Sequence, residues 1–328
     1  MFRTGVSAAV GTTALLVGLV AARAAAPSEA APAASLEPVR VFVSILPQAW
    51  FVQRIGGPHV EVHVLVGPGQ SPHTFEPTPR QMADLARARL FFTTGWPFET
   101  RVLEKARSIH PGLQVIDLRQ GITLRRFTDE EAGQGGEDED KDEGHRAGEP
   151  DPHIWLNPRL AAIQAAHIAQ ALAAADPDHA AEFQKNLETL QEDLRRADER
   201  LAGVLAPLRG QTFFVFHPAF GYFADAYGLR QRAVEIEGKE PTARGLADLI
   251  EKARASGVRI IFIQPQFSAK SAGAVARAIG GAVVPMDDLA RDYLANLEAM
   301  ADKIVQALQP EKPARRGGPA AAGKDAKP

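Results

Sequence analysis

Eight short runs of β-branched and aromatic residues alternate with helical patterns from Val39 onward, and this alternation constrains the fold more than any other feature. Strands that alternate with helices form βαβ units, in which the strands are parallel and helices cover the sheet. The sequence therefore predicts an α/β protein of two lobes, each a four-stranded, mainly parallel sheet flanked by helices. The runs form two groups of four: Val41–Ile45, Val60–Val66, Leu90–Thr94 and Gln114–Asp117, then Thr212–Phe216, Ala233–Ile236, Arg259–Ile263 and Ala282–Met286.

One long helical segment separates the two groups of strands. It begins at Asp176-Pro177-Asp178, where an N-cap residue precedes a proline at the first helical position. A helix from Pro177 to about Leu205 would be ~43 Å long at 1.5 Å per residue. We expect a rigid spine helix over residues 176–206 that joins the lobes, rather than a coiled-coil dimer seam, because the run covers only about four heptads. Its apolar residues recur at spacings of three and four, at Phe183, Leu187, Leu190, Leu194, Ala197, Leu201, Val204 and Leu208.

The two ends of the chain have the composition of segments outside the lobes. Residues 1–26 combine an early arginine, an apolar stretch and small-x-small cleavage candidates, which is the layout of a secretory signal peptide. A membrane anchor is the alternative, because roughly 18 apolar residues are the shortest plausible span. An Ala/Pro-rich linker over 27–38 and a flexible tail over 310–328 leave 39–175 and 207–309 for the two lobes.

Charge and cysteine content narrow the class of protein. The net charge is -3 and Lys and Arg form no basic stripe, so we expect no nucleic-acid partner. Eleven of the 23 residues in 129–151 are acidic, which predicts a solvated, disordered loop. The sequence contains no cysteine, so a lipid cannot be attached through one, and zinc sites built on cysteine are excluded. We expect a monomeric protein of the periplasm.

Three histidines lie where a fold of this class exposes a ligand site. His73 follows the predicted strand Val60–Val66, and His217 follows Thr212–Phe216. Ligands gather beyond the carboxyl ends of parallel strands, so both imidazoles are expected at a site rather than in a core. His153 lies in Asp-Pro-His-Ile-Trp-Leu-Asn-Pro, where the prolines prevent a regular strand or helix.

A carboxylate completes this candidate set. Asp287 follows the strand Ala282–Met286, so two candidate ligands precede the spine helix and two follow it. Three neutral imidazoles and one carboxylate in four-coordinate geometry suit Zn²⁺, whereas Mn²⁺ and Ca²⁺ prefer more oxygen donors. The sequence predicts one Zn²⁺ held by His73, His153, His217 and Asp287. We assign the remaining histidines to packing or connections, with at most a weak metal contact in the acidic loop: His59, His63, His110, His145, His167 and His179.

Five segments resemble the ordered motifs of the zinc/manganese substrate-binding family of ABC importers. The resemblance covers about Val39 to Leu308 and implies two four-stranded α/β lobes, a rigid linking helix and a metal buried between the lobes. It also implies a zinc-specific periplasmic protein that delivers Zn²⁺ to a membrane permease, because the manganese branch places Glu where this chain has His217. The segments are Ser71-Pro-His-Thr-Phe-Glu-Pro-Thr-Pro, Asp151-Pro-His-Ile-Trp-Leu-Asn-Pro, Phe216-His-Pro-Ala-Phe-Gly-Tyr-Phe, Glu237-Gly-Lys-Glu-Pro-Thr, and Met286-Asp-Asp-Leu with Asp292-Tyr-Leu.

Two departures from the family pattern concern the carboxylate ligand. Gln264 stands where many relatives have Glu, and Asp288 stands where proline usually follows the ligand Asp. Asp287 aligns best as the fourth ligand, and Asp288, Glu76 or a water molecule are the alternatives.

Two other functions use the same residues. Three histidines and an open coordination position also describe a secreted zinc hydrolase with Glu76 as general base, but neither H-E-x-x-H nor G-x-S-x-G occurs in the sequence. A metal-stabilised adhesin would hold zinc as a structural ion. Ligands divided between two lobes favour capture and release, so we expect a transport protein and not an enzyme.

Overall fold

The computed structural model describes residues 37–128, 131, 147–233, 250–251, 254–255, 259–267 and 269–309. The predicted signal peptide, most of the acidic loop, residues 237–242 and the predicted tail lie outside this part. None of the helices in the described part combines the length and the apolar character that a membrane span needs.

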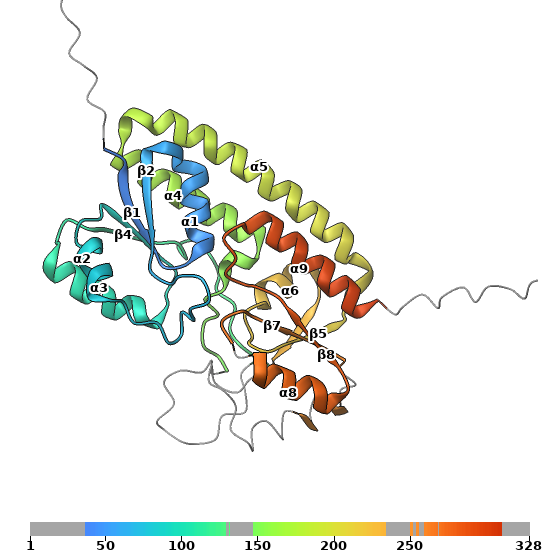
Figure 1. Cartoon of the computed structure of the whole chain (residues 1–328). Helices are drawn as coiled ribbons and strands as arrows, with labels where there is room; N and C mark the ends of the chain where they lie inside the picture. The colour runs from blue at the N-terminus through green and yellow to red at the C-terminus, as the bar shows by residue number, and fades with distance from the viewer. Residues whose placement is uncertain are drawn as a thin grey trace, which may run out of the picture. The chain divides into compact units, whose positions relative to one another are not determined.

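Two parallel four-stranded sheets form the framework (Figure 1). The strand order is β2-β1-β3-β4 in the first sheet and β6-β5-β7-β8 in the second, so the same topology occurs twice and the predicted fold class is confirmed. The first sheet consists of β1 (Val39–Val43), β2 (Val60–Val64), β3 (Leu90–Thr93) and β4 (Gln114–Asp117). The second consists of β5 (Thr212–Val215), β6 (Arg230–Ala233), β7 (Ile260–Ile263) and β8 (Ala282–Pro285).

The strand predicted at Ala233–Ile236 lies earlier in the chain. β6 pairs in parallel with β5, and Arg230 lies opposite Thr212. The preceding helix ends at Gly228, whose φ of 71° is in the left-handed region, so the chain turns there and enters the sheet two residues later. The β-branched residues on which the prediction rested therefore begin after the observed strand, and residues 234–236 lie outside the described part.

Helices follow most of the strands, and several begin at a proline. α2, α3 and α4 start at Pro79, Pro97 and Pro158, where the N–H that proline lacks would have no helical partner in any case. The described part includes α1 (Leu46–Gly56), α2 (Pro79–Leu85), α3 (Pro97–Ile109), α4 (Pro158–Ala175), α5 (Ala180–Leu205), α6 (Gly221–Tyr227), α8 (Ala269–Ile279) and α9 (Tyr293–Leu308). Short 3-10 turns occur at η1 (Gly57–His59), η2 (Ile154–Leu156), η3 (Pro177–His179) and η4 (Ala206–Leu208).

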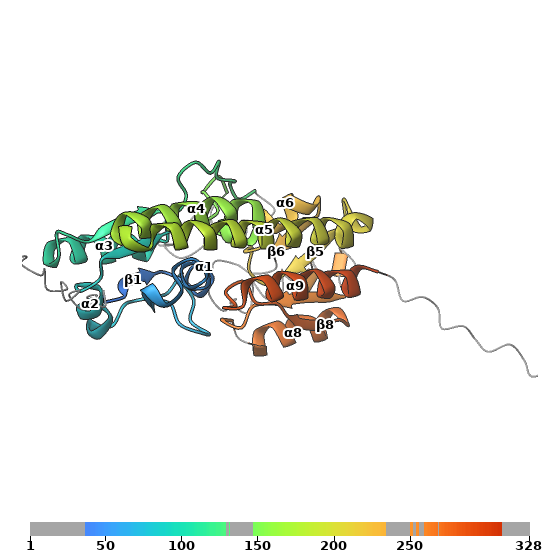
Figure 2. The same cartoon turned by 90° about the horizontal axis from the view of Figure 1, so that it is seen from above.

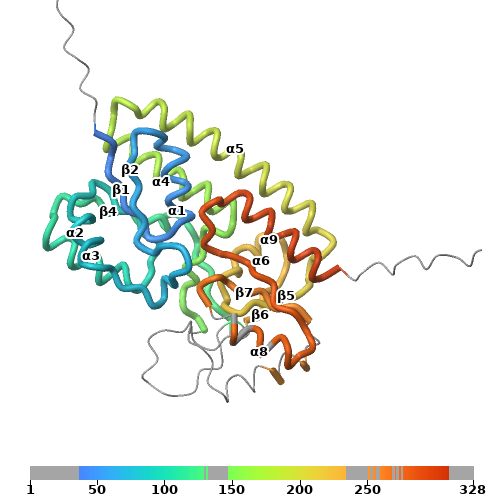
Figure 3. Tube along the Cα trace, viewed as in Figure 1, coloured from blue at the N-terminus to red at the C-terminus, as the bar shows by residue number. Residues whose placement is uncertain are grey.

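The predicted spine is α5, which has 26 residues and is therefore ~39 Å long. α1 and α4 pack against it beside the first sheet, and α9 packs against it beside the second (Figures 2 and 3). Its apolar stripe is buried as expected except at Val204, which is 40% exposed, because Leu205 faces the core in its place. One apolar core joins residues of both sheets to α5, so the helix holds the two sheets on one continuous packed body.

Candidate metal site

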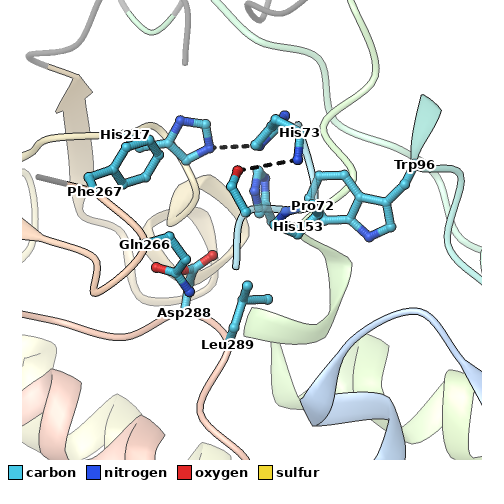
Figure 4. A pocket seen from close by; sticks show the side chains of 10 residues that line it. Pro72, His73, Trp96, His153, His217, Gln266, Phe267, Asp288 and Leu289 are labelled. Carbon is cyan, nitrogen blue, oxygen red and sulfur yellow. Dashed lines mark hydrogen bonds between the residues drawn. The ribbon is translucent and has the colours of Figure 1, made fainter. Parts of the chain in front are cut away.

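Two imidazoles from opposite sides of α5 in the sequence face each other. His73 lies in the loop after β2, and His217 lies two residues after the end of β5. Their Nε2 atoms are 3.1 Å apart, and a dashed line in Figure 4 marks this contact. Two ligands of a tetrahedral Zn²⁺ with Zn–N bonds of about 2.0–2.1 Å are separated by ~3.3 Å. The two side chains are therefore already placed close to the geometry of shared ligands.

His153 completes a group of three imidazoles at the start of η2. Each of the three offers a nitrogen, and these nitrogens all lie within 4.8 Å of one another. His153 Nδ1 lies 2.7 Å from Asp151 Oδ1, which also accepts a hydrogen bond of 2.9 Å from the His153 backbone N–H. A carboxylate at Nδ1 holds the proton there and leaves Nε2 as the metal donor.

An ion-pair network fixes that carboxylate, and it was not predicted from the sequence. Asp151 is fully buried, and its second oxygen accepts a hydrogen bond of 2.7 Å from Arg125 Nη1. Arg125 also pairs with Glu131 at 2.8 Å and with the exposed Asp225 at 3.0 Å. Tyr222 donates its hydroxyl proton to the Asp151 carbonyl at 3.1 Å. Residues before and after α5 thus jointly hold the Asp151–His153 pair.

Glu131 shows that the start of the acidic segment is not solvated as predicted. The residue is 5% exposed, and its side chain accepts hydrogen bonds from Arg125 and from Gln231 Nε2. Phe127 N–H also donates to the Glu149 carbonyl, so chain on both sides of residues 132–146 is tied to the fold. Glu131 and the backbone of Glu149 are therefore part of the fold, and residues 132–146 between them lie outside the described part.

Burial keeps the two facing imidazoles neutral. It lowers the pKa of His73 well below the usual 6.5, and the neighbouring His217 and His153 lower it further. Burial likewise lowers the pKa of His217 well below 6.5, with His153 adding to the effect and Asp151 opposing it. Only neutral imidazole binds a metal, so both side chains are ready donors at neutral pH.

Asp288, rather than Asp287, lies at the pocket of the three histidines. Asp287 Oδ1 accepts a hydrogen bond of 2.8 Å from the Leu289 N–H, and Asp287 does not line the pocket. Asp288 lines the pocket and is 6% exposed, and its Oδ1 has no hydrogen-bond partner within the described part of the chain. Burial raises the pKa of Asp288 to about 7, His153 opposes that shift, and Asp287 adds to it.

Glu76, the remaining carboxylate candidate, is exposed and does not line the pocket. Of the sequence-predicted ligands, the fold thus brings together the three histidines, and it adds the alternative Asp288.

Aromatic rings form the wall around the histidines. Trp96 meets His73 and His153 edge-on, with ring centroids 5.1 and 5.4 Å apart. Phe267 lies 5.2 Å from His217 on the other side. These rings exclude water from the donor atoms, which strengthens any electrostatic contact made there.

Gln264, noted in the sequence as a departure from Glu, positions His217 through the backbone. Its Nε2 donates to the His217 carbonyl at 3.0 Å, and its Oε1 accepts from the His217 N–H at 3.4 Å. A carboxylate accepts hydrogen bonds but cannot donate one when ionised, so only the amide makes both contacts.

The histidines assigned to packing divide into two groups. His167 contacts the Gln120 carbonyl at 2.9 Å, and His63 stacks on Phe42 with ring centroids 4.9 Å apart, as side chains in packing roles do. His59 and His179 instead lie against each other and close to Asp176, in a second group of possible metal donors.

Comparison with known proteins gives relatives over most of the chain. The family model described as zinc-uptake complex component A, periplasmic, matches residues 41–307. The high-affinity zinc uptake system protein ZnuA of Bacillus subtilis is 30% identical over 247 residues, which are 74% of this chain and 76% of that protein. The zinc-binding lipoprotein AdcA of Streptococcus pneumoniae is 28% identical over 84% of this chain, and the chain spans 57% of its length.

Solved structures have the same fold. A crystal structure of ZnuA matches with a TM-score of 0.72 and 38% identity, over 83% of this chain and 99% of that one. A ZnuA deletion mutant with zinc bound matches with a TM-score of 0.72 and 39% identity, over 84% of this chain and 100% of that one.

Proposed function

This chain belongs to the family of the periplasmic component A of zinc-uptake complexes, and we propose that it captures Zn²⁺ with His73, His153 and His217 and delivers the ion to an ABC-type importer. Asp288 is the fourth donor that the geometry favours, and Asp287 remains the donor that the sequence motif favours. The whole protein is proposed to reach the periplasm through a cleaved signal peptide, to carry no lipid on cysteine, and to act as a monomer.

The single observation that carries this proposal is the convergence of three imidazole nitrogens within 4.8 Å, at a pocket whose lining includes the buried His153, His217 and Asp288. Zn²⁺ accepts nitrogen and oxygen donors in a tetrahedral arrangement, and a buried carboxylate with a raised pKa beside it gains a partner when the ion binds. The uncharged His73 and His217 also mean that no proton has to be removed from them before zinc enters at neutral pH.

Capture and release follow from the division of the donors along the chain. His73 and His153 precede α5, while His217 and Asp288 follow it, so one ion contacts segments carried by both sheets. A permease that binds more tightly to a different arrangement of these segments lowers the affinity for zinc, by as much as its own affinities for the two arrangements differ. We place the two lobes at 39–175 and 207–309, joined by the spine over 176–206.

Catalysis is not part of the proposal. A zinc hydrolase needs a general base near the metal, and Glu76, the residue available for that role in the sequence, is exposed and lies outside the pocket lining. The donors His153 and His217 are 1% and 4% exposed, which suits the enclosure of an ion better than access for a polymeric substrate.

A competition titration with a zinc chelator tests the proposal. The purified mature protein is expected to bind one Zn²⁺ tightly at this site, and His73→Ala, His153→Ala and His217→Ala each to weaken it by more than ~100-fold, because even an outer hydrogen-bond partner of a ligand contributes 10–100-fold. His167→Ala is the matched control, since this histidine contacts a backbone carbonyl away from the pocket. Wild-type affinity in any of the three variants would remove that residue from the ligand set.

A further inference from the structure

A second group of metal-binding side chains lies at the beginning of α5. His59 ends η1, and Asp176 and His179 stand at the two ends of η3, just before α5. Their donor atoms all lie within 4.8 Å of one another, although His59 is more than 100 residues away in the sequence. None of the three lines the pocket of His73, His153 and His217.

The two imidazoles and their carboxylate neighbours are held in close contact. The rings of His59 and His179 stack with centroids 3.6 Å apart and an interplanar angle of 21°. His59 Nε2 lies 3.1 Å from Glu182 Oε2, and His179 Nδ1 lies 2.7 Å from Asp176 Oδ2. Nitrogen and oxygen donors from η1, from η3 with its N-cap residue, and from the first turn of α5 therefore lie close together.

Asp176 supplies an independent indication of a ligand. The residue is 8% exposed, and its Oδ1 is buried with no hydrogen-bond partner in the described part of the chain. Leaving a buried polar oxygen unpaired costs free energy, and the cost is larger for a charged group. A cation bound by this carboxylate through Oδ1 would remove that cost.

The donor types define the class of cation. Two imidazoles with carboxylate oxygens suit Zn²⁺ and similar late divalent metals, whereas Ca²⁺ and Mg²⁺ prefer sites made of oxygen. Asp176, Asp178 and Glu182 place three carboxylates near the start of α5, and these outweigh the positive end of the helix dipole for a cation. The imidazoles of His59 and His179 are 22% and 30% exposed, so the ion has access from solvent.

We propose that His59, Asp176 and His179, with Glu182, form a second Zn²⁺ site, separate from the site of capture. Zinc there links η1, which leads into β2, to the first turn of the spine helix. Its affinity is lower than that of the buried site, because the donors are partly hydrated and their hydrogen bonds to one another must be exchanged for bonds to the ion.

Equilibrium dialysis against buffered micromolar Zn²⁺, followed by elemental analysis, tests the second site. Wild-type protein is expected to retain one more equivalent than His59→Ala or His179→Ala. The double variant His73→Ala/His217→Ala loses the equivalent of the capture site and keeps the second one. The zinc content of each site is therefore measured separately. If the proposed capture site bound no zinc, the comparison of wild type with His59→Ala and His179→Ala would still test the second site.

His63→Ala is the matched control, because His63 is also a partly buried histidine paired with a carboxylate, Glu61 at 2.9 Å, but belongs to no group of three donors among the residues that the structure describes. It is expected to retain as much zinc as wild type. Cobalt binding to the His73→Ala/His217→Ala protein gives a second measurement of this site. Visible absorption bands from nitrogen and oxygen ligands are expected, and they are expected to disappear when His59→Ala is combined with the double variant. Equal zinc content in wild type, His59→Ala and His179→Ala, or an equal loss in His63→Ala, would overturn the proposal.

Discussion

Replacement of Asp151 by Asn tests how the outer hydrogen bonds of the capture site contribute to zinc binding. The carboxylate accepts three hydrogen bonds, from the backbone N–H and Nδ1 of His153 through Oδ1 and from Arg125 through Oδ2. An amide keeps one oxygen and replaces the other by a donor NH₂ group. In one orientation NH₂ faces Arg125, and in the other it faces both N–H groups of His153, so either orientation sets donor against donor.

The expected magnitude follows from these contacts. Loss of an outer partner of a metal-binding histidine reduces metal affinity by about 10–100-fold, which is ~1.4–2.8 kcal/mol in binding free energy. The zinc-free protein is expected to lose about 1–3 kcal/mol of unfolding free energy, the cost of an unsatisfied buried group. The larger cost of a fully unpaired buried charge is not expected, because Arg125 keeps Glu131 and Asp225 as partners.

Chelator competition and urea unfolding measure the two quantities. Asp225→Asn is the matched control, since Asp225 binds the same guanidinium but is 61% exposed and does not contact His153. It is expected to change stability by less than ~1 kcal/mol and to leave zinc affinity unchanged. Zinc affinity of Asp151→Asn equal to that of wild type would refute the role given to the Asp151–His153 hydrogen bond.

Three further outcomes are expected. Gly221→Ala is expected to weaken zinc binding and to lower stability, because a Cβ there would lie 1.8 Å from Arg125 Nη1. Gly203→Ala, on an open face of α5, is expected to leave zinc affinity intact and to raise stability by up to ~1 kcal/mol. Chelator competition and urea unfolding compare the two variants, and equal behaviour would contradict the packing argument. Zinc affinity changes by no more than about twofold from pH 8 to 7, because, of the donors whose pKa values are shifted, only Asp288, with a pKa of about 7, starts to take up a proton there, while the pKa values of His73 and His217 lie well below 6.5. Zinc-free protein loses stability below about pH 6.5, because the unfolded chain takes up protons before His73 and His217 do. Titrations at stepped pH check both outcomes, and a fall in affinity of more than about tenfold between pH 8 and 7 would contradict the first. Replacing residues 132–146 by a short Gly-Ser linker is expected to leave the zinc affinity within about twofold of wild type, because the segment's composition supports no packed core. A strong loss of affinity in the same chelator titration would instead make the segment a source of ligands.

Periodicity predicted most of the fold because most of the strands and helices follow their local patterns. The spine helix is an example: spacings of three and four placed its buried face, and only Val204 was assigned wrongly, since Leu205 one position later faces the core. β6 shows the limit of this reasoning. Its residues include two arginines and a glutamine, and the left-handed Gly228 and the pairing with β5 decide its position.

The candidate site was predictable as far as strand ends identify it. His73 and His217 follow β2 and β5, His153 was identified by the prolines that flank it, and the fold brings the three together. The choice between Asp287 and Asp288 was not predictable, because neighbouring side chains point in different directions and the loop after β8 selects which one lines the pocket. The network of Arg125 was not predictable either, since it joins residues about 100 positions apart through burial rather than through any local pattern.

The identity of the atoms around the bound ion tests the central claim most directly. Zinc K-edge X-ray absorption on the mature protein loaded with one equivalent of Zn²⁺ is expected to show four light donors, with imidazole multiple scattering from three histidines at about 2.0–2.1 Å and one carboxylate oxygen. A shell made of oxygen alone, or imidazole scattering that persists unchanged in His73→Ala/His217→Ala protein that also carries His59→Ala, would contradict capture of zinc by these three histidines.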